Sequence, residues 1–216
     1  MAGRKQGGSG AGGAAKRKLP RFDPGPSGRF AARVLRELGV PGALIGRLAV
    51  WEWIPDEGEH AFTKDLDVAV RREDLPRIRA WIEKQGLSAR ELGIGGVNVR
   101  APETAVNVDF VDRTSPEFGD LGLLFGEAIE AARVRVDVGG ASLRLVPAEH
   151  LLAMKIATGE PDDARDAERL LLHAGVDVAA ARKIVAAHLG ALGMGVLEAL
   201  LRQVGHPDAR PKRKSE

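Results

Sequence analysis

An aspartate pair at the start of one strand is the feature that most limits how this chain can fold. Asp65-Leu66-Asp67 opens a segment whose alternating pattern, from Lys64 to Val70, predicts a β-strand. Residues two apart on a strand project to the same face, so both carboxylates point one way and Leu66 points the other. Two like charges this close are unfavourable unless a cation lies between them or water solvates both. The pair therefore belongs either to a solvated strand face or to a metal site.

A third carboxylate lies in a second alternating segment, AVNVDFVDR. Its apolar residues Val106, Val108 and Phe110 share one face, and Asp109 lies on the other face among strand-forming residues. If this strand pairs with the one that begins at Asp65, three carboxylates converge where one or two metal ions can bind. Carboxylate oxygens are the ligands that Mg²⁺ usually takes from a protein.

Short strands alternate with helical stretches along the body of the chain. The segment 43–50 is a strand or the start of a helix, and 51–63 has the composition of a loop. The segments with helical spacing are 30–38, 73–86, 121–132 and most of 147–204, and the expected strands are 64–70, 87–92, 97–101, 105–112 and two arms joined at Gly139-Gly140. This order predicts an α/β (α+β) fold, with a mixed sheet flanked by helices and a helical C-terminal portion.

The net charge of +2 arises at the two ends of the chain. Residues 1–28 and 206–216 are rich in Lys and Arg and lack apolar periodicity, so we expect both to be disordered basic tails. Between them we expect an α/β core at 29–146 and a helical portion at 147–205. The tails either solubilise the protein or hold RNA or DNA loosely through charge.

A lysine falls on the apolar side of one predicted helix. In PAEHLLAMKIAT, Lys155 lies near the middle of the apolar arc. A lysine that faces a core needs a carboxylate or a ligand phosphate as its partner, unless its ammonium reaches back to the surface. Asp163 and Asp166, spaced i, i+3 on the next helix, are either partners for this lysine or a nearby arginine, or acids favoured by the helix dipole.

Missing residue types exclude several classes of protein. The chain has no cysteine, which excludes disulfides, cysteine zinc sites, iron–sulfur clusters and thiol catalysis. The five histidines show no metal-binding spacing, and no serine nucleophile elbow is present. No apolar run in the sequence approaches the ~20 residues of a membrane span, and no signal-peptide pattern opens the chain. We therefore expect a cytoplasmic protein without a membrane partner.

Together these motifs resemble the nucleotidyltransferases of the DNA polymerase β superfamily, and most closely the abortive-infection (AbiEii-like) branch found in bacterial toxin–antitoxin systems. The resemblance spans roughly residues 30–175. It is carried by four stretches of sequence: ALIGRLA (43–49), TKDLD (63–67), NVDF (107–110) and VPAEHLLAMKIATGEPDDARDAERLL (146–171).

The resemblance implies a metal-dependent transfer of an NMP from an NTP to an acceptor hydroxyl on RNA (tRNA), protein or a small molecule. It further implies a toxin role and a cognate antitoxin. Two Mg²⁺ (or Mn²⁺) ions would be held by Asp65, Asp67 and Asp109, with Lys155 as a fourth catalytic residue that supplies positive charge. The residues implied for nucleotide binding are Gly46, Arg47, Lys64, Lys155, Asp163 and Asp166.

The chain departs from the family pattern at three positions. Arg47 stands where many members have a small residue, although an arginine can itself bind a phosphate. Glu160 and Asp162 stand where basic residues are frequent, which weakens the attraction for a triphosphate. Two alternatives therefore stay open: a non-catalytic protein of this fold that acts as a binding or regulatory partner, and a nucleic-acid-binding module that uses its basic tails.

Overall fold

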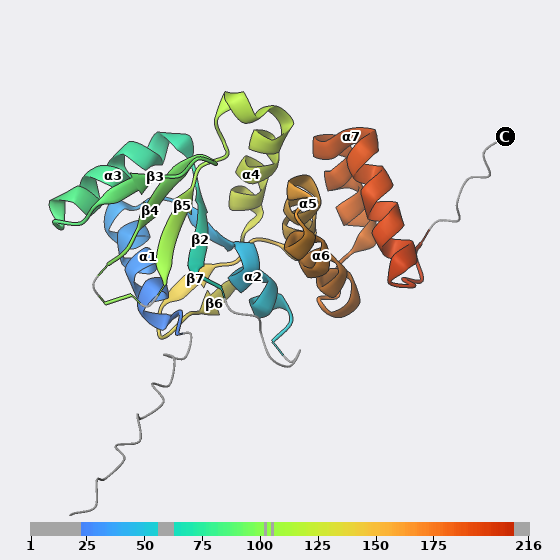
Figure 1. Cartoon of the computed structure of the whole chain (residues 1–216), viewed down its shortest axis with the longest axis horizontal. Coiled ribbons are helices and arrows are strands. Elements are labelled where there is room, and N and C mark those ends of the chain that lie inside the picture. The colour runs from blue at the N-terminus through green and yellow to red at the C-terminus, as the bar shows by residue number, and fades with distance from the viewer. Residues whose placement is uncertain (1–22, 56–62, 102, 105, 210–216) are drawn as a thin grey trace, which may run out of the picture.

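A mixed sheet, helices on both of its faces and a helical end make up the structure, a computed structural model that describes residues 23–55, 63–101, 103–104 and 106–209 (Figure 1). The helices and strands, in chain order, are α1 (Gly25–Leu38), β1 (Gly42–Ile45), α2 (Gly46–Trp53), β2 (Asp65–Val70), α3 (Leu75–Lys84), β3 (Ala89–Glu91), β4 (Gly96–Val99), β5 (Asn107–Val111), α4 (Gly119–Ala131), β6 (Arg135–Asp137), β7 (Ser142–Arg144), α5 (Ala148–Thr158), α6 (Pro161–His173) and α7 (Val178–Gln203). Two short 3₁₀ turns lie at Arg72–Asp74 and Pro116–Phe118.

The sheet has the strand order β1-β2-β5-β4-β3, and β6 and β7 form a separate hairpin. Strands β2 and β5 are parallel neighbours at the centre, whereas the other pairs are antiparallel. Helices α1 and α3 cover one face of the sheet (Figure 1), and the T-shaped contact of Phe30 with Trp81 joins these two helices. The expected fold class, a mixed sheet flanked by helices with a helical C-terminal portion, is confirmed.

The central strands form because their apolar residues are buried on the sheet. Leu66 and Val68 of β2, and Val108 and Phe110 of β5, are fully buried. Burial of such side chains contributes roughly 1.5–3 kcal/mol each, which holds the parallel pair in register. One continuous apolar core joins the sheet to α5, α6 and α7. The division into units at 29–146 and 147–205 stays a prediction.

Helix α1 begins at Gly25, so the expected tail boundary at residue 28 was placed too late. Prolines at the first turn suit a helix start because their fixed φ is already helical. The Ser27 hydroxyl donates a hydrogen bond to the Val106 carbonyl at 2.8 Å, which ties this turn to the sheet. Residues 1–22 lie outside the described residues.

Two further boundaries differ from the expected ones. Segment 43–50 contains both of the expected alternatives, because β1 ends at Ile45 and α2 begins at Gly46. Helix α2 continues into the expected loop to Trp53, whose indole donates to the Val146 carbonyl at 2.9 Å. The second tail also begins later than 206, since the Asp208 carbonyl accepts a hydrogen bond from Arg182. Residues 56–62 and 210–216 lie outside the described part of the chain.

The expectation that no apolar run approaches the length of a membrane span is wrong for helix α7. By length and composition alone, Val178–Gln203 is long and apolar enough to cross a membrane. Gly190 has a non-helical backbone (φ 60°, ψ −153°), and Arg182 and Glu198 form an ion pair at 2.7 Å. In a straight helix these two residues would lie about 24 Å apart. The chain therefore folds back at Gly190, and each arm is too short to cross a bilayer.

We predict opposite effects of alanine at two helical glycines. At Gly28 a Cβ would lie 2.7 Å from the backbone oxygen of Val138, so Gly28→Ala should destabilise the fold by about 1–3 kcal/mol. Gly126 in α4 has open space around it, and Gly126→Ala should stabilise by about 0.5–1 kcal/mol because alanine favours helix. Urea unfolding measures both values. Equal effects at the two positions would contradict the packing of α1 against the hairpin.

Candidate active site

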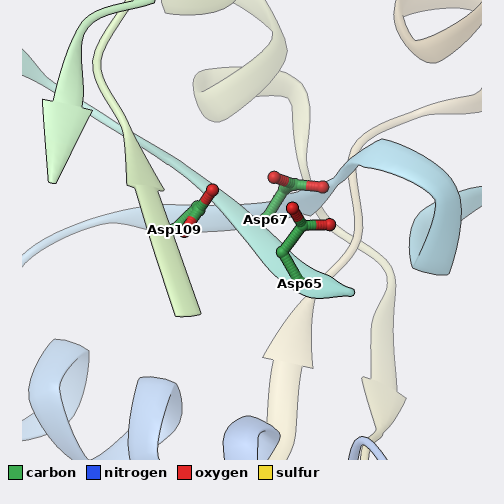
Figure 2. Close-up of side chains that lie close together, drawn as sticks. All are labelled: Asp65, Asp67 and Asp109. Carbon is green, nitrogen blue, oxygen red and sulfur yellow. The ribbon is translucent and has the colours of Figure 1, made fainter. Parts of the chain in front are cut away.

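Three carboxylates meet on the face of the sheet opposite α1 and α3. In the parallel register of β2 and β5, Asp67 is paired with Asp109, and Asp65 precedes Asp67 by two residues on the same face. Each of the three offers a carboxylate oxygen, and these oxygens all lie within 4.8 Å of one another. Figure 2 shows the three side chains gathered over the two strands. The pairing on which the metal-site hypothesis depended is therefore present.

Neighbouring groups orient two of these carboxylates. The Asn98 side chain on β4, whose register partner is Asp109, donates a hydrogen bond to Asp109 Oδ1. The Thr63 hydroxyl donates to the Asp65 backbone oxygen at 3.1 Å and lies 3.3 Å from Asp65 Oδ1. Both contacts come from polar side chains that leave the second carboxylate oxygen available to a ligand.

Gly46 is needed as glycine at the junction between β1 and α2. Its φ of 69° lies in the left-handed region, where a side chain is strained. A Cβ at this position would also collide with the Asp67 carboxylate, because Ile45 is the register partner of Asp67. The absence of a side chain at Gly46 therefore leaves room for the Asp67 carboxylate.

The electrostatics show a cluster of negative charge that is only partly neutralised. Burial, and next the charges of Asp65 and Asp109, raise the pKa of Asp67 to about 8, against an opposing effect of Lys155. Burial is also the main cause that raises the pKa of Asp109, partly offset by the hydrogen bond from Asn98. A divalent cation between the carboxylates would remove this penalty. Oxygen-only donors of this kind fit Mg²⁺ or Mn²⁺ better than a soft metal.

Lys155 is buried and faces two acids. Its ammonium pairs with Asp163, which also accepts from the Thr158 hydroxyl, and with Asp166 at 2.9 Å. Of the alternatives for this lysine, the structure selects the carboxylate partners. Of the alternatives for Asp163 and Asp166, it selects ion pairing, because both contact a cation directly.

Two of the departures from the family pattern pair with each other. Arg47 Nη2 lies 3.3 Å from Asp162, and Arg47 Nε lies 3.4 Å from Asp166. The guanidinium is therefore turned toward α6 and is already neutralised. Glu160, the third departure, is exposed just before α6.

A cavity of about 500 Å³ opens over the carboxylates, between the sheet and helices α4, α5 and α6. It is lined by Asp65, Asp67, Gly46, Arg47, Lys155 and Asp163, together with the exposed Lys64. Asp109 lies beside the cavity without lining it, and Asp166 lies behind Lys155. The sequence-predicted residues are thus brought to one place.

Arg113 also lines this cavity, and sequence analysis missed it. Its guanidinium lies 5.4 Å from the centre of the Phe118 ring, and its Nε is buried without a hydrogen-bond partner among the described residues. Burial lowers the pKa of Arg113. The strand alternation could not have indicated it, because Arg113 lies two residues beyond the end of β5 at Val111.

Within the described residues, the four cations that line the cavity fall into two pairs. Arg47 and Lys155 are neutralised by acids of α6, whereas Arg113 and Lys64 have no ion pair. Positive charge without an ion pair among the described residues therefore flanks the carboxylates, with Lys64 just before β2 and Arg113 just beyond the other end of the strand pair, after β5.

Comparison with known proteins gives limited information. No family model matches the chain, and no curated protein matches it. Among solved structures, an antigenic nucleotidyltransferase-like protein from Paracoccidioides brasiliensis aligns over 80% of this chain and 89% of its own, at 16% identity and a TM-score of 0.46.

The antibiotic-resistance factor ANT(2'')-Ia also aligns, in two structures. Its solution structure covers 82% of this chain and 91% of its own, at 16% identity and a TM-score of 0.46. Its complex with adenylyl-2''-tobramycin covers 79% and 92%, at 18% identity and a TM-score of 0.43. With TM-scores below 0.5, we argue function from the residues of the site itself.

We predict that Asp67→Asn stabilises the metal-free protein. A carboxyl whose pKa is raised by folding holds its proton more tightly in the folded state, so stability falls as pH rises from about 4 toward 8. Removing this charge should raise the melting temperature at pH 8 by about 5 °C in EDTA, and by much less at pH 5. Thermal melts at both pH values measure this. Melts that show no gain at pH 8 would contradict the proposed repulsion.

Proposed function

We propose that this chain is a metal-dependent nucleotidyltransferase that moves an NMP from an NTP to an acceptor hydroxyl. The observation that carries the proposal is the carboxylate triad of Asp65, Asp67 and Asp109 on adjacent parallel strands, with Asp65 and Asp67 lining a cavity that also holds two cations without an ion pair among the described residues. The resemblance of the motifs to DNA polymerase β-type nucleotidyltransferases supports the same reaction. The finer assignment to the AbiEii-like branch rests on that resemblance alone.

The proposed transfer forms a bond between the acceptor oxygen and the α-phosphorus, and breaks the bond to the β-phosphate, which leaves as pyrophosphate. Mg²⁺ or Mn²⁺ ions held by the three aspartates would supply positive charge to the phosphate oxygens. Asn98 donates a hydrogen bond to one oxygen of Asp109, and in the proposed reaction the second oxygen of Asp109 would take the proton of the acceptor hydroxyl. The pKa of Asp109, raised mainly by burial, suits that role.

Arg113 is the residue we propose to bind the phosphates, in place of Arg47. Arg47 and Lys155 form ion pairs with Asp162, Asp163 and Asp166. Because all three acids lie on α6, these ion pairs hold α6 against the site. A guanidinium on the cavity wall that has no ion pair among the described residues can bind two phosphate oxygens at once. The exposed Lys64 adds a second charge to the cavity lining, at the other end of the strand pair.

A second candidate function, metal binding without catalysis, is favoured because Arg47 and Lys155 are already neutralised by acids of α6. If Arg113 and Lys64 attract too little triphosphate, the site binds a metal without transferring a nucleotide, and the protein acts as a binding or regulatory partner. A toxin role with a cognate antitoxin, an RNA (tRNA) acceptor and a cytoplasmic location remain proposals from the resemblance. Labelled-nucleotide transfer to total tRNA, to protein and to tobramycin separates the acceptor classes.

We predict that an NTP stabilises the protein only with Mg²⁺ or Mn²⁺ present. A ligand at one hundred times its Kd should add about 2.7 kcal/mol, which is a shift of several degrees. Asp65→Asn and Asp109→Asn should each abolish this shift and the transfer of labelled nucleotide. Glu83→Gln, an exposed acid on α3 outside the cavity lining, is the matched control and should keep both. Thermal melts across ATP, CTP, GTP and UTP test this.

If no nucleotide shifts the melting temperature under any metal condition, the transferase proposal fails. If metal alone shifts it and nucleotides add nothing, the non-catalytic alternative holds. Labelling that persists in both aspartate variants would refute the assignment of the triad.

We predict that Arg113→Gln raises KM for the NTP about 10- to 100-fold, because a charge-assisted hydrogen bond to phosphate is lost. Arg165→Gln is the matched control, since Arg165 is exposed on α6 and does not line the cavity. Initial rates over a range of NTP concentrations measure both variants. An unchanged KM in Arg113→Gln would show that another residue binds the phosphates.

A further inference from the structure

A second and larger cavity, of about 950 Å³, lies at the other end of strand β1. Gly42 lines this cavity, whereas Ile45 at the opposite end of β1 is paired with Asp67. Helix α1 forms one wall and the β6–β7 hairpin forms the other, and the two lie together in Figure 1. The cavity is therefore distinct from the carboxylate site.

Its charged lining is almost entirely basic. Among the described residues, Glu103 is the one acid, and the five arginines are Arg29, Arg33, Arg36, Arg135 and Arg144. We call this feature the arginine cavity. Such a concentration of like charge costs free energy, unless each charge is solvated or an anion binds.

Internal contacts hold the arginines in place and neutralise few of them. Arg33 approaches Glu103 at 3.5 Å and stacks over the Phe30 and Trp81 rings. Arg29 donates to the Gly139 carbonyl at 2.6 Å, and Arg144 donates to the Gly42 carbonyl at 3.1 Å. Carbonyl oxygens orient a guanidinium but leave its charge uncompensated.

Arg135 is held in the same way, through the Ser142 hydroxyl at 2.8 Å, and Arg36 has no ion pair with any described residue. Arg144 Nη2 is buried without a hydrogen-bond partner in the described structure. Burial first, and then the charges of Arg133, Arg135 and Arg71, lower the pKa of Arg144. On the hairpin wall of the arginine cavity, Arg144 therefore has a free hydrogen-bond donor, and neither Arg135 nor Arg144 is paired with an acid among the described residues.

We propose that the arginine cavity binds the sugar–phosphate backbone of a nucleic acid strand. Arg29, Arg33 and Arg36 recur on one face of α1, over about 10 Å of helix. Arg135 and Arg144, register partners in the hairpin, stand across from that row. A single phosphate is satisfied by two or three arginines, so two facing rows suit successive phosphates along a chain.

The lining predicts how such a strand is recognised. Its aromatic ring, Phe30, is buried and cannot stack on a base. The cavity therefore contacts phosphates without reading the bases, and binding should not depend on sequence. The proposal is independent of the transferase reaction, because no residue of the carboxylate site takes part.

The amino-acid sequence adds charge of the same sign just before this wall. Helix α1 is preceded by six basic residues, Arg4, Lys5, Lys16, Arg17, Lys18 and Arg21. Any test must therefore separate the contribution of the arginine cavity from that of the preceding segment. Substituting arginines in the full chain does so, because every variant keeps residues 1–22.

The experiment measures fluorescence anisotropy of a labelled 20-nucleotide single-stranded RNA, in EDTA, with the full-length protein. The cavity variant is Arg29→Gln, Arg36→Gln and Arg135→Gln, three exposed side chains whose loss should leave the fold intact. The control removes the same charge at three exposed positions elsewhere, Lys84→Gln, Arg90→Gln and Arg100→Gln. The cavity variant should bind at least about tenfold more weakly, with a salt slope smaller by about two.

Three further arms sharpen the outcome. A DNA strand of the same sequence shows whether the 2′-hydroxyl matters, and a permuted RNA should bind equally. Asp65→Asn should bind RNA like the wild type, so failure of the transferase proposal leaves this one intact. Equal loss in the cavity and control variants would overturn the proposal. So would unchanged RNA binding, or a cavity variant that loses only inorganic tripolyphosphate.

Discussion

The convergence of three carboxylates on two parallel strands, with Asp109 buried and Asp65 and Asp67 half-buried, is the constraint on which the site depends. Asp67 cannot be accommodated unless residue 46 is glycine, because its carboxylate occupies the space of a Cβ there. Asp109 is oriented by Asn98 from the neighbouring strand, so β4 is needed as well as β2 and β5. The site therefore requires particular residues at paired positions on three adjoining strands: Asp67 on β2, Asp109 on β5 and Asn98 on β4.

The charges around the triad form two layers with different tasks. The inner layer is negative, and burial together with the charges of Asp65 and Asp109 raises the pKa of Asp67, so a divalent cation would stabilise the ionised carboxylates. The outer layer consists of Lys155 and Arg47 against Asp162, Asp163 and Asp166, which fastens α6 to α5 and α2. Because Asp166 contacts both cations, removing it would leave Lys155 paired with Asp163 alone and Arg47 paired with Asp162 alone.

Local patterns in the sequence predicted the parts of this site that depend on one element. Alternation around Asp65 and Asp109 placed their side chains on a strand face, and the helical arc placed Lys155 toward the core. The Arg47–Asp162 pair could not be predicted, since its partners meet only through tertiary packing of α2 against α6. The start of α1 at Gly25 was hidden by a Gly- and Pro-rich composition that is typical of disorder. The reversal of α7 was hidden by an apolar pattern that continues through Gly190.

Strand β1 connects two regions of opposite charge. At Ile45 it lies beside the half-buried carboxylate of Asp67, and at Gly42 it accepts a hydrogen bond from Arg144 beside the arginine cavity. Gly42 and Ile45 lie about 10 Å apart along the strand, which exceeds the Debye length of about 8 Å at physiological ionic strength, so neither region neutralises the other fully. A polyanion is therefore drawn to the arginine end and repelled from the metal-free carboxylates. Divalent metal, bound at the triad as we propose, would remove that repulsion, and a phosphate-bearing substrate would then approach the acidic end only once the metal is bound.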